Sequence, residues 1–345
     1  MVKDMDQFMN IIRPIQLFED TVLILDQTLL PGEERWLEIH DYRNMIEAIK
    51  SLRVRGAPLL GLAAITAIYL AAIEFTNDDN FAGRLAKAIQ EVEASRPTAV
   101  NLFKATARVK AILNSSANSE DVINQLRNLY LSIHRFEEAA CDSMGQNGAS
   151  LFQSSGKLNI MTICNTGSLA TIGIGTALGV IRTLAQSHDV HVYATETRPL
   201  LQGARLTMWE LQKSGIPATL ITDNMAGWVM KTKGIDAILT GADRITVSGD
   251  TANKIGTLNL AILAHHYHIP FYVVAPETTI DTSISSGDEI RIEERKPGEI
   301  TFICKQSIAP EGCDVFNPAF DVTPHSLISG IITDRGVYKP PCKFE

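Results

Sequence analysis

The pattern of apolar and polar positions divides the chain into two halves. In the first half, two short β-forming runs, 21–25 and 36–39, flank a Pro-Gly turn at 30–32 and predict a small sheet. Helical periodicity follows, and we expect helices at 42–52, 57–73, 80–94, 101–114 and 119–145. The sequence therefore predicts a smaller N-terminal domain over residues 1–150, made of a short antiparallel sheet plus helices.

The second half alternates between strand and helix signals. Strands are expected at 158–163, 190–195, 218–222, 236–240, 270–275 and 300–304, and helices at 169–185, 202–213, 225–232 and 255–267. Such alternation is typical of a mostly parallel sheet with helices on both faces. We therefore predict an α/β protein with a Rossmann-like C-terminal domain over residues 151–345.

The stretch from 57 to 73 contains no charge and resembles a membrane span. It is slightly short for that role and rich in Ala, and an apolar helix of this length is usually buried among other helices. The amino terminus carries no apolar signal region, so we expect a cytoplasmic protein without membrane contact.

Composition narrows the classes of partner. A net charge of −8 argues against broad nucleic-acid binding, although a small anion needs only a few local cations. Five cysteines without C-x-x-C favour neither a disulfide framework nor a zinc ribbon, and the histidines at 265–268 have no Cys or carboxylate at ligand spacing. The glycines of 173–179 miss the dinucleotide-binding pattern and are interpreted as helix-packing positions. We expect no metal and no cofactor.

The stretch 160–171 carries the most informative cysteine. Residues 160–163 form the end of a predicted strand, and 165–168 form a tight turn that starts the next helix. Cys164 would then face a helix N-terminus, whose N–H groups and dipole favour anions and thiolates. Position alone leaves two interpretations open, a catalytic thiol or a small buried hydrophobe.

Polar segments follow the other predicted strands, at 196–205, 223–224, 241–244 and 253–254. Ligands of such sheets bind beyond the carboxyl ends of the strands, so these segments should rim one cleft. Asp243, partly buried near a thiolate, would have a raised pKa and could serve as a general acid. Its alternative is a turn aspartate that bonds to its own backbone.

Several charged residues suit a phosphate. Lys254 with Asn253 lies at a predicted helix start, where N–H donors also point at anions. Arg55 and Arg96 lie in loops of the first half and could clamp a phosphate bidentately, or could form ion pairs at a domain interface. Asp321 either lines the cleft or caps the helix that follows it, and we expect capping.

Several strings together resemble one known family, the S-methyl-5-thioribose-1-phosphate isomerases. These strings are VRGAP (54–58), SRPTAVNL (95–102), MTICNTGSLAT (161–171), ETRPLLQGARLT (196–207), GADRI (241–245) and GDTANKIGT (249–257). The likeness runs from about residue 15 to the end. The wider superfamily includes ribose-1,5-bisphosphate isomerases and regulatory subunits of the eukaryotic initiation-factor exchange complex.

The resemblance implies conversion of 5-methylthioribose 1-phosphate to its ketose in methionine salvage, by a homodimer without metal or cofactor. It places the catalytic pair on Cys164 and Asp243. It places the substrate contacts on Arg55, Gly56, Ala57, Arg96, Gln202, Asn253 and Lys254. Three alternatives stay open: ribose 1,5-bisphosphate as substrate, 5-deoxyribose 1-phosphate as substrate, or a non-catalytic sugar-phosphate-binding regulatory subunit.

Overall fold

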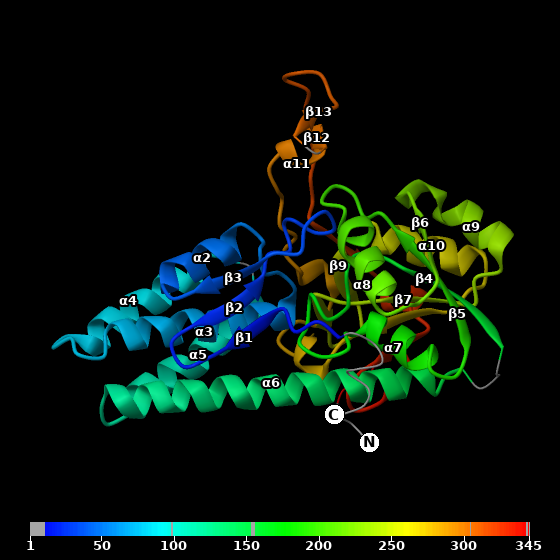
Figure 1. The fold of residues 1–345 in the computed structure, drawn as a ribbon. Helices are drawn as coiled ribbons and strands as arrows, with labels where there is room; N and C mark the ends of the chain where they lie inside the picture. The colour runs from blue at the N-terminus through cyan, green and yellow to red at the C-terminus, as the bar shows by residue number, and fades with distance from the viewer. Residues whose placement is uncertain (1–10, 98, 153–155, 304, 343, 345) are drawn as a thin grey trace. The chain divides into compact units, whose positions relative to one another are not determined.

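A computed structural model describes residues 11–97, 99–152, 156–303, 305–342 and 344. The chain forms two compact units (Figure 1). The N-terminal unit consists of Ile11–Ala139 and Ser168–Gly175, and the C-terminal unit contains Ala140–Gly167 and Thr176–Glu345. The domain boundary at 150 stays a prediction. The short segment at 168–175 belongs to the N-terminal unit although it follows Cys164 in the chain.

The N-terminal unit begins with a small sheet. Its strands are β1 (Ile15–Leu17), β2 (Val22–Leu25) and β3 (Trp36–Ile39), all antiparallel, with β2 in the middle. Val22 and Ile24 lie on the inner face and are fully buried. The predicted antiparallel sheet is confirmed, with β1 as an additional strand.

Five helices follow the sheet within the described residues. They are α2 (Tyr42–Lys50), α3 (Ala57–Glu74), α4 (Phe81–Glu93), α5 (Val100–Ser115) and α6 (Ser119–Ala149). Helix α2 begins where the Asp41 carboxylate accepts a hydrogen bond from the Arg43 N–H at 2.7 Å. Each lies close to its predicted range, because apolar periodicity is a reliable signal in long helices.

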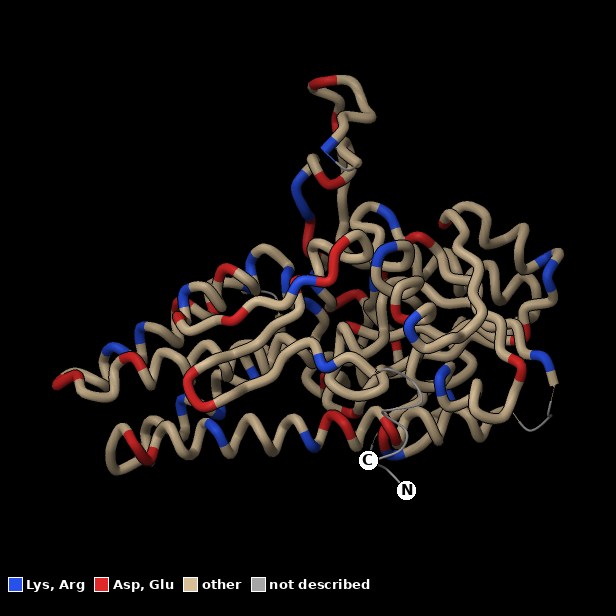
Figure 2. The backbone as a smooth tube through the Cα atoms, in the orientation of Figure 1, with Lys and Arg blue, Asp and Glu red and all other residues tan. Residues whose placement is uncertain are grey.

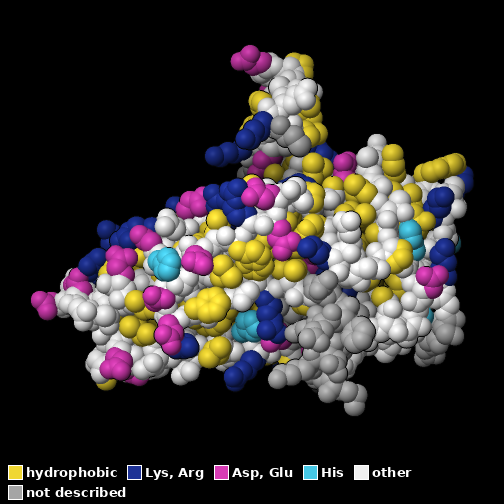
Figure 3. Space-filling view, in the orientation of Figure 1, with side chains coloured by type: hydrophobic (Ala, Val, Ile, Leu, Met, Phe, Trp, Pro, Cys, Tyr) yellow, Lys and Arg dark blue, Asp and Glu magenta, His cyan; other side chains and the backbone are white. Residues whose placement is uncertain are grey.

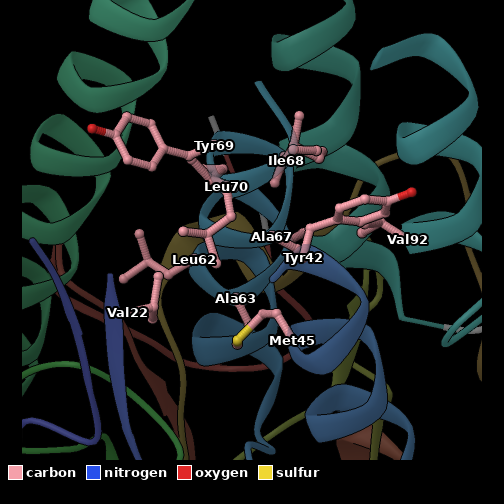
Figure 4. Packing of buried hydrophobic residues seen from close by; sticks show 14 of the residues in the cluster. Val22, Tyr42, Met45, Leu62, Ala63, Ala67, Ile68, Tyr69, Leu70 and Val92 are labelled. Atoms are coloured by element: carbon pink, nitrogen blue, oxygen red, sulfur yellow. The ribbon is translucent and has the colours of Figure 1, made fainter. Parts of the chain in front are cut away.

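Helix α3 is long and apolar enough to cross a membrane. In the structure, however, 78% of its residues are buried within the protein. Figure 4 shows its residue Leu62 beside Val22 of the sheet and its residue Ala63 close to Met45 of α2. The helix is therefore the core of the N-terminal unit, as its Ala-rich composition indicated.

The C-terminal unit is built on a seven-stranded sheet in the order β16-β15-β10-β7-β4-β5-β6. The strands are β4 (Lys157–Thr162), β5 (Asp189–Thr195), β6 (Ala218–Ile221), β7 (Ala237–Thr240), β10 (Phe271–Val274), β15 (Gly330–Ile332) and β16 (Val337–Tyr338). All neighbours are parallel except β16, which pairs antiparallel at one edge. The mostly parallel sheet is confirmed.

Both faces of this sheet are covered. The helices of the unit are α7 (Ala177–Leu184), a π-helix (Gly203–Thr207) continuing into α8 (Met208–Lys213), α9 (Ala226–Lys233) and α10 (Thr257–His266). Met161 and Ile238 on one face pack in a cluster with Met230 of α9 and Leu260 of α10. Ile160 points to the opposite face and is equally inaccessible to water.

A second, four-stranded sheet was not predicted. Its order is β11 (Ile280–Asp281), β8 (Arg244–Thr246), β9 (Thr251–Lys254) and β14 (Phe320–Thr323). The strand predicted at 300–304 is mostly wrong, because Gly298–Thr301 forms the short helix α11 and only β12 (Phe302–Ile303) is extended. This strand pairs with β13 (Gln306–Ser307) in a hairpin that projects from the unit (Figure 1). Single 3₁₀ turns occur at Asp223–Met225, Glu277–Thr279, Gly287–Glu289 and His325–Leu327.

The helix predicted at 169–185 is wrong over its first half, because α7 begins only at Ala177. Gly175 has a φ of 100°, which breaks a helix. The Thr166 hydroxyl accepts the Leu178 N–H at 3.2 Å, and the Thr166 carbonyl accepts the Thr176 N–H at 2.8 Å. Gly173 and Gly175 thus lie in a long loop rather than at helix-packing positions.

Candidate active site

The point where strand order reverses marks the binding edge of the large sheet. From β4 the chain adds β5 and β6 on one side, then returns to add β7, β10 and β15 on the other side. The ends of β4 and β7 therefore flank a topological switch point, which is where ligands of such sheets bind. Cys164 follows β4 and Asp243 follows β7.

Cys164 is held in an unusual backbone conformation. Its φ is 63°, in the left-handed region, and its exposed fraction is 8%. The Cys164 N–H donates to the Thr197 hydroxyl at 2.8 Å, and the Cys164 carbonyl accepts from the Thr207 hydroxyl at 2.5 Å. A strained non-glycine residue persists only where its surroundings fix it, as at active sites.

Thr197 shares this strain. Its φ is 65°, which is rare for a β-branched residue, and its side chain is fully buried. The Asp223 carboxylate holds the turn by accepting the N–H groups of Thr197 and Arg198 at 2.8 and 2.7 Å. Two strained residues in direct hydrogen-bond contact mark this edge of the sheet independently of any sequence motif.

The loop that carries Cys164 touches the segments that carry the other predicted residues of this unit. A Cβ placed on Gly241 would lie 2.9 Å from Thr166 Cγ2, and one on Gly256 would lie 3.2 Å from Ile163 Cδ1. The Thr197 contact adds the segment before Gln202. Segments containing Cys164, Gln202, Asp243, Asn253 and Lys254 thus meet around one loop.

Gln202 opens the π-helix that follows β5 and is 6% exposed. Its Oε1 is buried and has no hydrogen-bond partner among the described residues. A buried acceptor left without a donor is costly unless a ligand supplies one. Irregular π turns also occur preferentially at functional sites. Gln202 is therefore suited to accept a hydrogen bond from a hydroxyl group.

Asn253 and Lys254 lie in strand β9, which was not predicted, and the predicted helix start follows them at Thr257 of α10. Lys254 is 7% exposed, and its ammonium donates to the Ala319 carbonyl at 2.8 Å and lies 4.3 Å from the centre of the Phe320 ring. Asn253 Nδ2 donates to the Thr257 hydroxyl at 3.0 Å. Both side chains are thus fixed by packing.

Asp321 occupies the start of helix α10. Its carboxylate accepts the N–H groups of Gly256 at 2.7 Å and Leu258 at 3.1 Å. Burial raises the pKa of Asp321 to about 6, although these two hydrogen bonds and Lys254 oppose the shift. We predicted that Asp321 caps the helix after it, but it caps α10, which precedes it in the chain. The carboxylate thereby accepts two N–H groups at the helix start that we expected to face a phosphate.

Asp243 is exposed, so the partial burial expected for it is wrong. Its backbone N–H donates to the Ala252 carbonyl at 2.9 Å, which ties the end of β7 to strand β9. The carboxylate therefore meets solvent at the switch point.

The remaining predicted residues belong to the N-terminal unit. Gly56 precedes α3 with a φ of 102°, and a Cβ there would lie 2.4 Å from the Ala170 carbonyl oxygen. Arg55 and Arg96 are half-buried, and Ala57 starts α3. The first turns of α3 and α5 touch, because a Cβ on Gly61 would lie 3.4 Å from Asn101 O. The Arg55 and Arg96 loops therefore lie at one end of this unit. Their joint action on a phosphate stays a prediction.

Sequence reasoning missed two buried charges beneath the Cys164 loop. Arg182 and Glu210 are each 1% exposed and form an ion pair at 2.9 Å. Asn165 Nδ2 donates to Glu210 at 2.8 Å. An arginine in the apolar run 177–184 was the available signal, since an unpaired arginine is almost never fully buried.

The other cysteines that the structure describes lack this setting. Cys141 and Cys342 are buried and Cys313 is exposed, whereas Cys304 lies outside the described residues. Burial raises the pKa of Cys342 to about 11. In the described part of the chain, no three His, Cys, Asp or Glu side chains are arranged to hold a metal ion.

Fold and site together define an α/β protein with a polar site at the switch point of a parallel sheet. The chain belongs to the initiation factor 2 subunit family, whose model matches residues 53–340.

Relatives and solved structures cover almost the whole chain. A methylthioribose-1-phosphate isomerase from Dehalococcoides mccartyi is 50% identical over 95% of this chain and 99% of its own. A 5-deoxyribose 1-phosphate isomerase from Moorella thermoacetica is 48% identical over 96% and 95%. The structure resembles 5-methylthioribose 1-phosphate isomerase from Pyrococcus horikoshii, with a TM-score of 0.90 and 40% identity over 98% of this chain and 95% of that one. It also resembles translation initiation factor eIF-2B, subunit delta, from A. fulgidus, with a TM-score of 0.86 and 40% identity over 96% of each chain.

Proposed function

We propose that this chain is an aldose–ketose isomerase that converts 5-methylthioribose 1-phosphate to 5-methylthioribulose 1-phosphate, a step of methionine salvage. Relatives of that name match about half of its residues over nearly its whole length. The observation that carries the proposal is the strained Cys164 loop, around which the segments of Gln202, Asp243 and Lys254 meet. A thiol and a carboxylate near one bound sugar suit the transfer of protons.

The reaction is an internal redox change that needs no external oxidant. The phosphate on C1 prevents spontaneous ring opening, so the C1–O4 bond must break while O4 receives a proton. Hydrogen then moves from C2 to C1, and the C2 hydroxyl loses its proton to become a ketone. Every proton taken up at one step is released at another.

Asp243 and Cys164 divide these steps in our proposal. Asp243 delivers the proton to O4, and the Cys164 thiolate removes the C2 proton so that an enol forms before C1 is protonated. The other route is a direct hydride shift from C2 to C1, in which Cys164 only positions the sugar. Each acid or base group contributes about 10²–10⁴-fold to the rate.

The substrate-binding residues of this proposal are Arg55, Gly56, Ala57, Arg96, Gln202, Asn253 and Lys254. Gln202 Oε1 accepts a sugar hydroxyl, which gives its buried acceptor a partner. Arg55 and Arg96 bind the phosphate with Gly56 and Ala57, since guanidinium groups hold phosphate bidentately. Lys254 and Asn253, fixed in β9, provide a cation and an amide donor.

Kinetics of two variants test the assignment. We expect Cys164→Ala and Asp243→Asn each to lower kcat by about 10²–10⁴-fold. Cys313→Ala, which removes an exposed thiol far from these segments in sequence, serves as the matched control and should retain full turnover. Near-normal turnover in either test variant would remove that residue from the mechanism.

Deuterium at C2 distinguishes the two routes. Loss of deuterium to solvent during turnover supports proton removal by Cys164. Complete retention at C1 supports the hydride shift and leaves the thiol a positioning role only.

A second candidate substrate is 5-deoxyribose 1-phosphate, because one relative at 48% identity carries that name. It differs only at C5, where hydrogen replaces a methylthio group. Comparing kcat/KM for these two sugars and for ribose 1,5-bisphosphate decides among them. Tight binding of a sugar phosphate without turnover of any of the three would instead indicate a regulatory subunit.

We further propose a cytoplasmic homodimer that binds neither membranes nor nucleic acid. The projecting hairpin and the segment that follows it expose three large apolar side chains, Phe302, Ile308 and Phe316, and Figure 3 shows apolar surface along this projection. A second copy of the chain would cover such a surface. Against nucleic-acid binding, Figure 2 shows acidic and basic residues interspersed along both units, without one broad basic stretch. Light scattering of the purified chain measures the oligomeric state, and a monomeric mass contradicts the dimer.

A further inference from the structure

A fully buried ion pair lies beneath the loop that follows β4. Arg182 of α7 donates to Glu210 of α8 at 2.9 Å through Nη2 and to the Ser214 hydroxyl at 3.2 Å through Nε. Charged side chains are almost never buried this deeply, because removing each of the two charges from water costs free energy. A buried ion pair therefore adds little net stability to the fold, and its other contacts indicate what role it has.

The pair contacts the residues that directly follow Cys164. Glu210 Oε1 accepts from Asn165 Nδ2 at 2.8 Å, and the same amide lies 3.3 Å from the Thr207 hydroxyl. That hydroxyl donates to the Cys164 carbonyl at 2.5 Å. An unbroken chain of hydrogen bonds thus runs from Arg182 to the backbone of Cys164.

Gly167 closes the loop over the same carboxylate. A Cβ at this position would lie 2.3 Å from Glu210 Oε2 and 2.4 Å from Oε1, so the backbone rests directly on Glu210. Asn165 itself is 3% exposed, and its amide donates to the Glu210 carboxylate and the Thr207 hydroxyl. The carboxylate therefore fixes both ends of the 165–167 turn.

We propose that Glu210, oriented by Arg182, is a positioning residue that fixes the direction of the Cys164 sulfur through Asn165, Thr207 and Gly167. This inference rests on the proposed isomerase function, in which Cys164 acts on C2 of the sugar. The left-handed φ of Cys164 is unfavourable by itself. The buried network supplies the contacts that keep the residue there.

Two variants cut the network at different points while sparing Cys164. Asn165→Ala removes the amide link and leaves the ion pair intact. The double variant Arg182→Met with Glu210→Met replaces both charges by apolar side chains of similar length, a change that buried pairs often tolerate. We expect each to lower kcat by about 10²-fold with KM changed less than threefold, because small misplacements of a reacting group cost this much.

Alkylation of Cys164 by iodoacetamide, measured peptide by peptide against pH, gives a readout that needs no turnover. We expect the Cys164 profile to shift in both variants while that of the exposed Cys313 stays unchanged as an internal reference. Thr66→Val, a buried hydroxyl in α3 that donates to the Ala63 carbonyl, should change neither kcat nor either profile.

The outcomes separate the possibilities. Unchanged kcat and unchanged Cys164 alkylation in both variants would overturn the positioning role. A raised KM in Asn165→Ala with a normal double variant would overturn it too, since Asn165 would then bind the sugar directly. If the double variant does not fold, Glu210→Gln keeps an acceptor for Asn165 and should retain more turnover than Asn165→Ala. If the wild-type chain turns over no sugar, the proposed function fails, while the alkylation profiles still test the network.

Discussion

The left-handed backbone at Cys164 makes a testable statement about stability. Cys164 and Cys141 are both buried cysteines of the C-terminal unit, at 8% and 1% exposure. Cys164 has a φ of 63°, whereas Cys141 lies inside helix α6. Replacing each by Ala and by Gly removes the same thiol and differs only in the Cβ. The comparison isolates the backbone contribution.

The difference in stability between the Gly and the Ala variant should have opposite signs at the two positions. A residue with a Cβ in the left-handed region costs about 1–2 kcal/mol, and glycine avoids this. Glycine loses about 0.4–1 kcal/mol through the greater freedom of the unfolded chain. Cys164→Gly should therefore be more stable than Cys164→Ala by about 0.8 kcal/mol. In the helix, Cys141→Gly should be less stable than Cys141→Ala by about 0.8–1.0 kcal/mol.

Thermal and urea unfolding of the four variants, followed by circular dichroism, measure the two differences. For a folded unit of the size of the C-terminal unit, a change of 1 kcal/mol in the free energy of unfolding corresponds to roughly 2–4 °C in Tm. A Cys164→Gly variant less stable than Cys164→Ala, by an amount equal to that at Cys141, would refute the strain argument. Both Cys164 variants should be catalytically impaired, so stability rather than turnover is the decisive quantity.

Three further predictions concern Asp321, Gly203 and the two arginines Arg55 and Arg96. Because the pKa of Asp321 is raised from 3.8 to about 6, the folded chain holds this proton more tightly, and its contribution to the free energy of unfolding falls as pH rises between those values. Asp321→Asn should remove that slope, and a pH-independent difference in Tm from the wild type contradicts this. A Cβ on Gly203 would lie 1.8 Å from the Thr195 carbonyl oxygen, so Gly203→Ala should lower stability by about 1–3 kcal/mol or more, and an unchanged melting curve argues against the close approach. Arg55→Lys and Arg96→Lys should each raise KM by about tenfold with kcat retained, since Lys cannot form the bidentate contact, and unchanged KM values would exclude a phosphate clamp.

The large sheet could be predicted from the sequence because its strands are short apolar runs separated by clear helical periods. The same reasoning failed at residues 169–176, where Ala and Leu suggested a helix that Thr171, Gly173 and Gly175 do not support. The four-stranded sheet was missed for another reason. Strands such as Arg244–Thr246 are too short and polar for a periodic signal and exist only through pairing with distant segments.

The candidate site, like the fold, could be predicted only in part. Cys164 could be located because a strand followed by a polar turn is visible in the chain. The supports of that residue could not, since Thr197, Thr207 and Glu210 become its neighbours only when β4 and β5 pair. The capping of α10 by Asp321 likewise depends on β9 and β14 lying side by side. Local patterns locate reactive residues, whereas tertiary pairing determines their surroundings.

The division of the N-terminal unit between two stretches of sequence affects how the chain is made. Residues 11–139 leave the ribosome first. The segment 168–175, in which Ala170 packs on Gly56 and the buried Ile172 packs on the core around α3, is complete only after 36 more residues have been added. At about 5–20 residues per second, that interval is roughly 2–7 s. During biosynthesis the first unit to emerge thus waits for its last eight residues. A fragment that ends at residue 150 lacks them permanently and should expose apolar surface that the full chain covers.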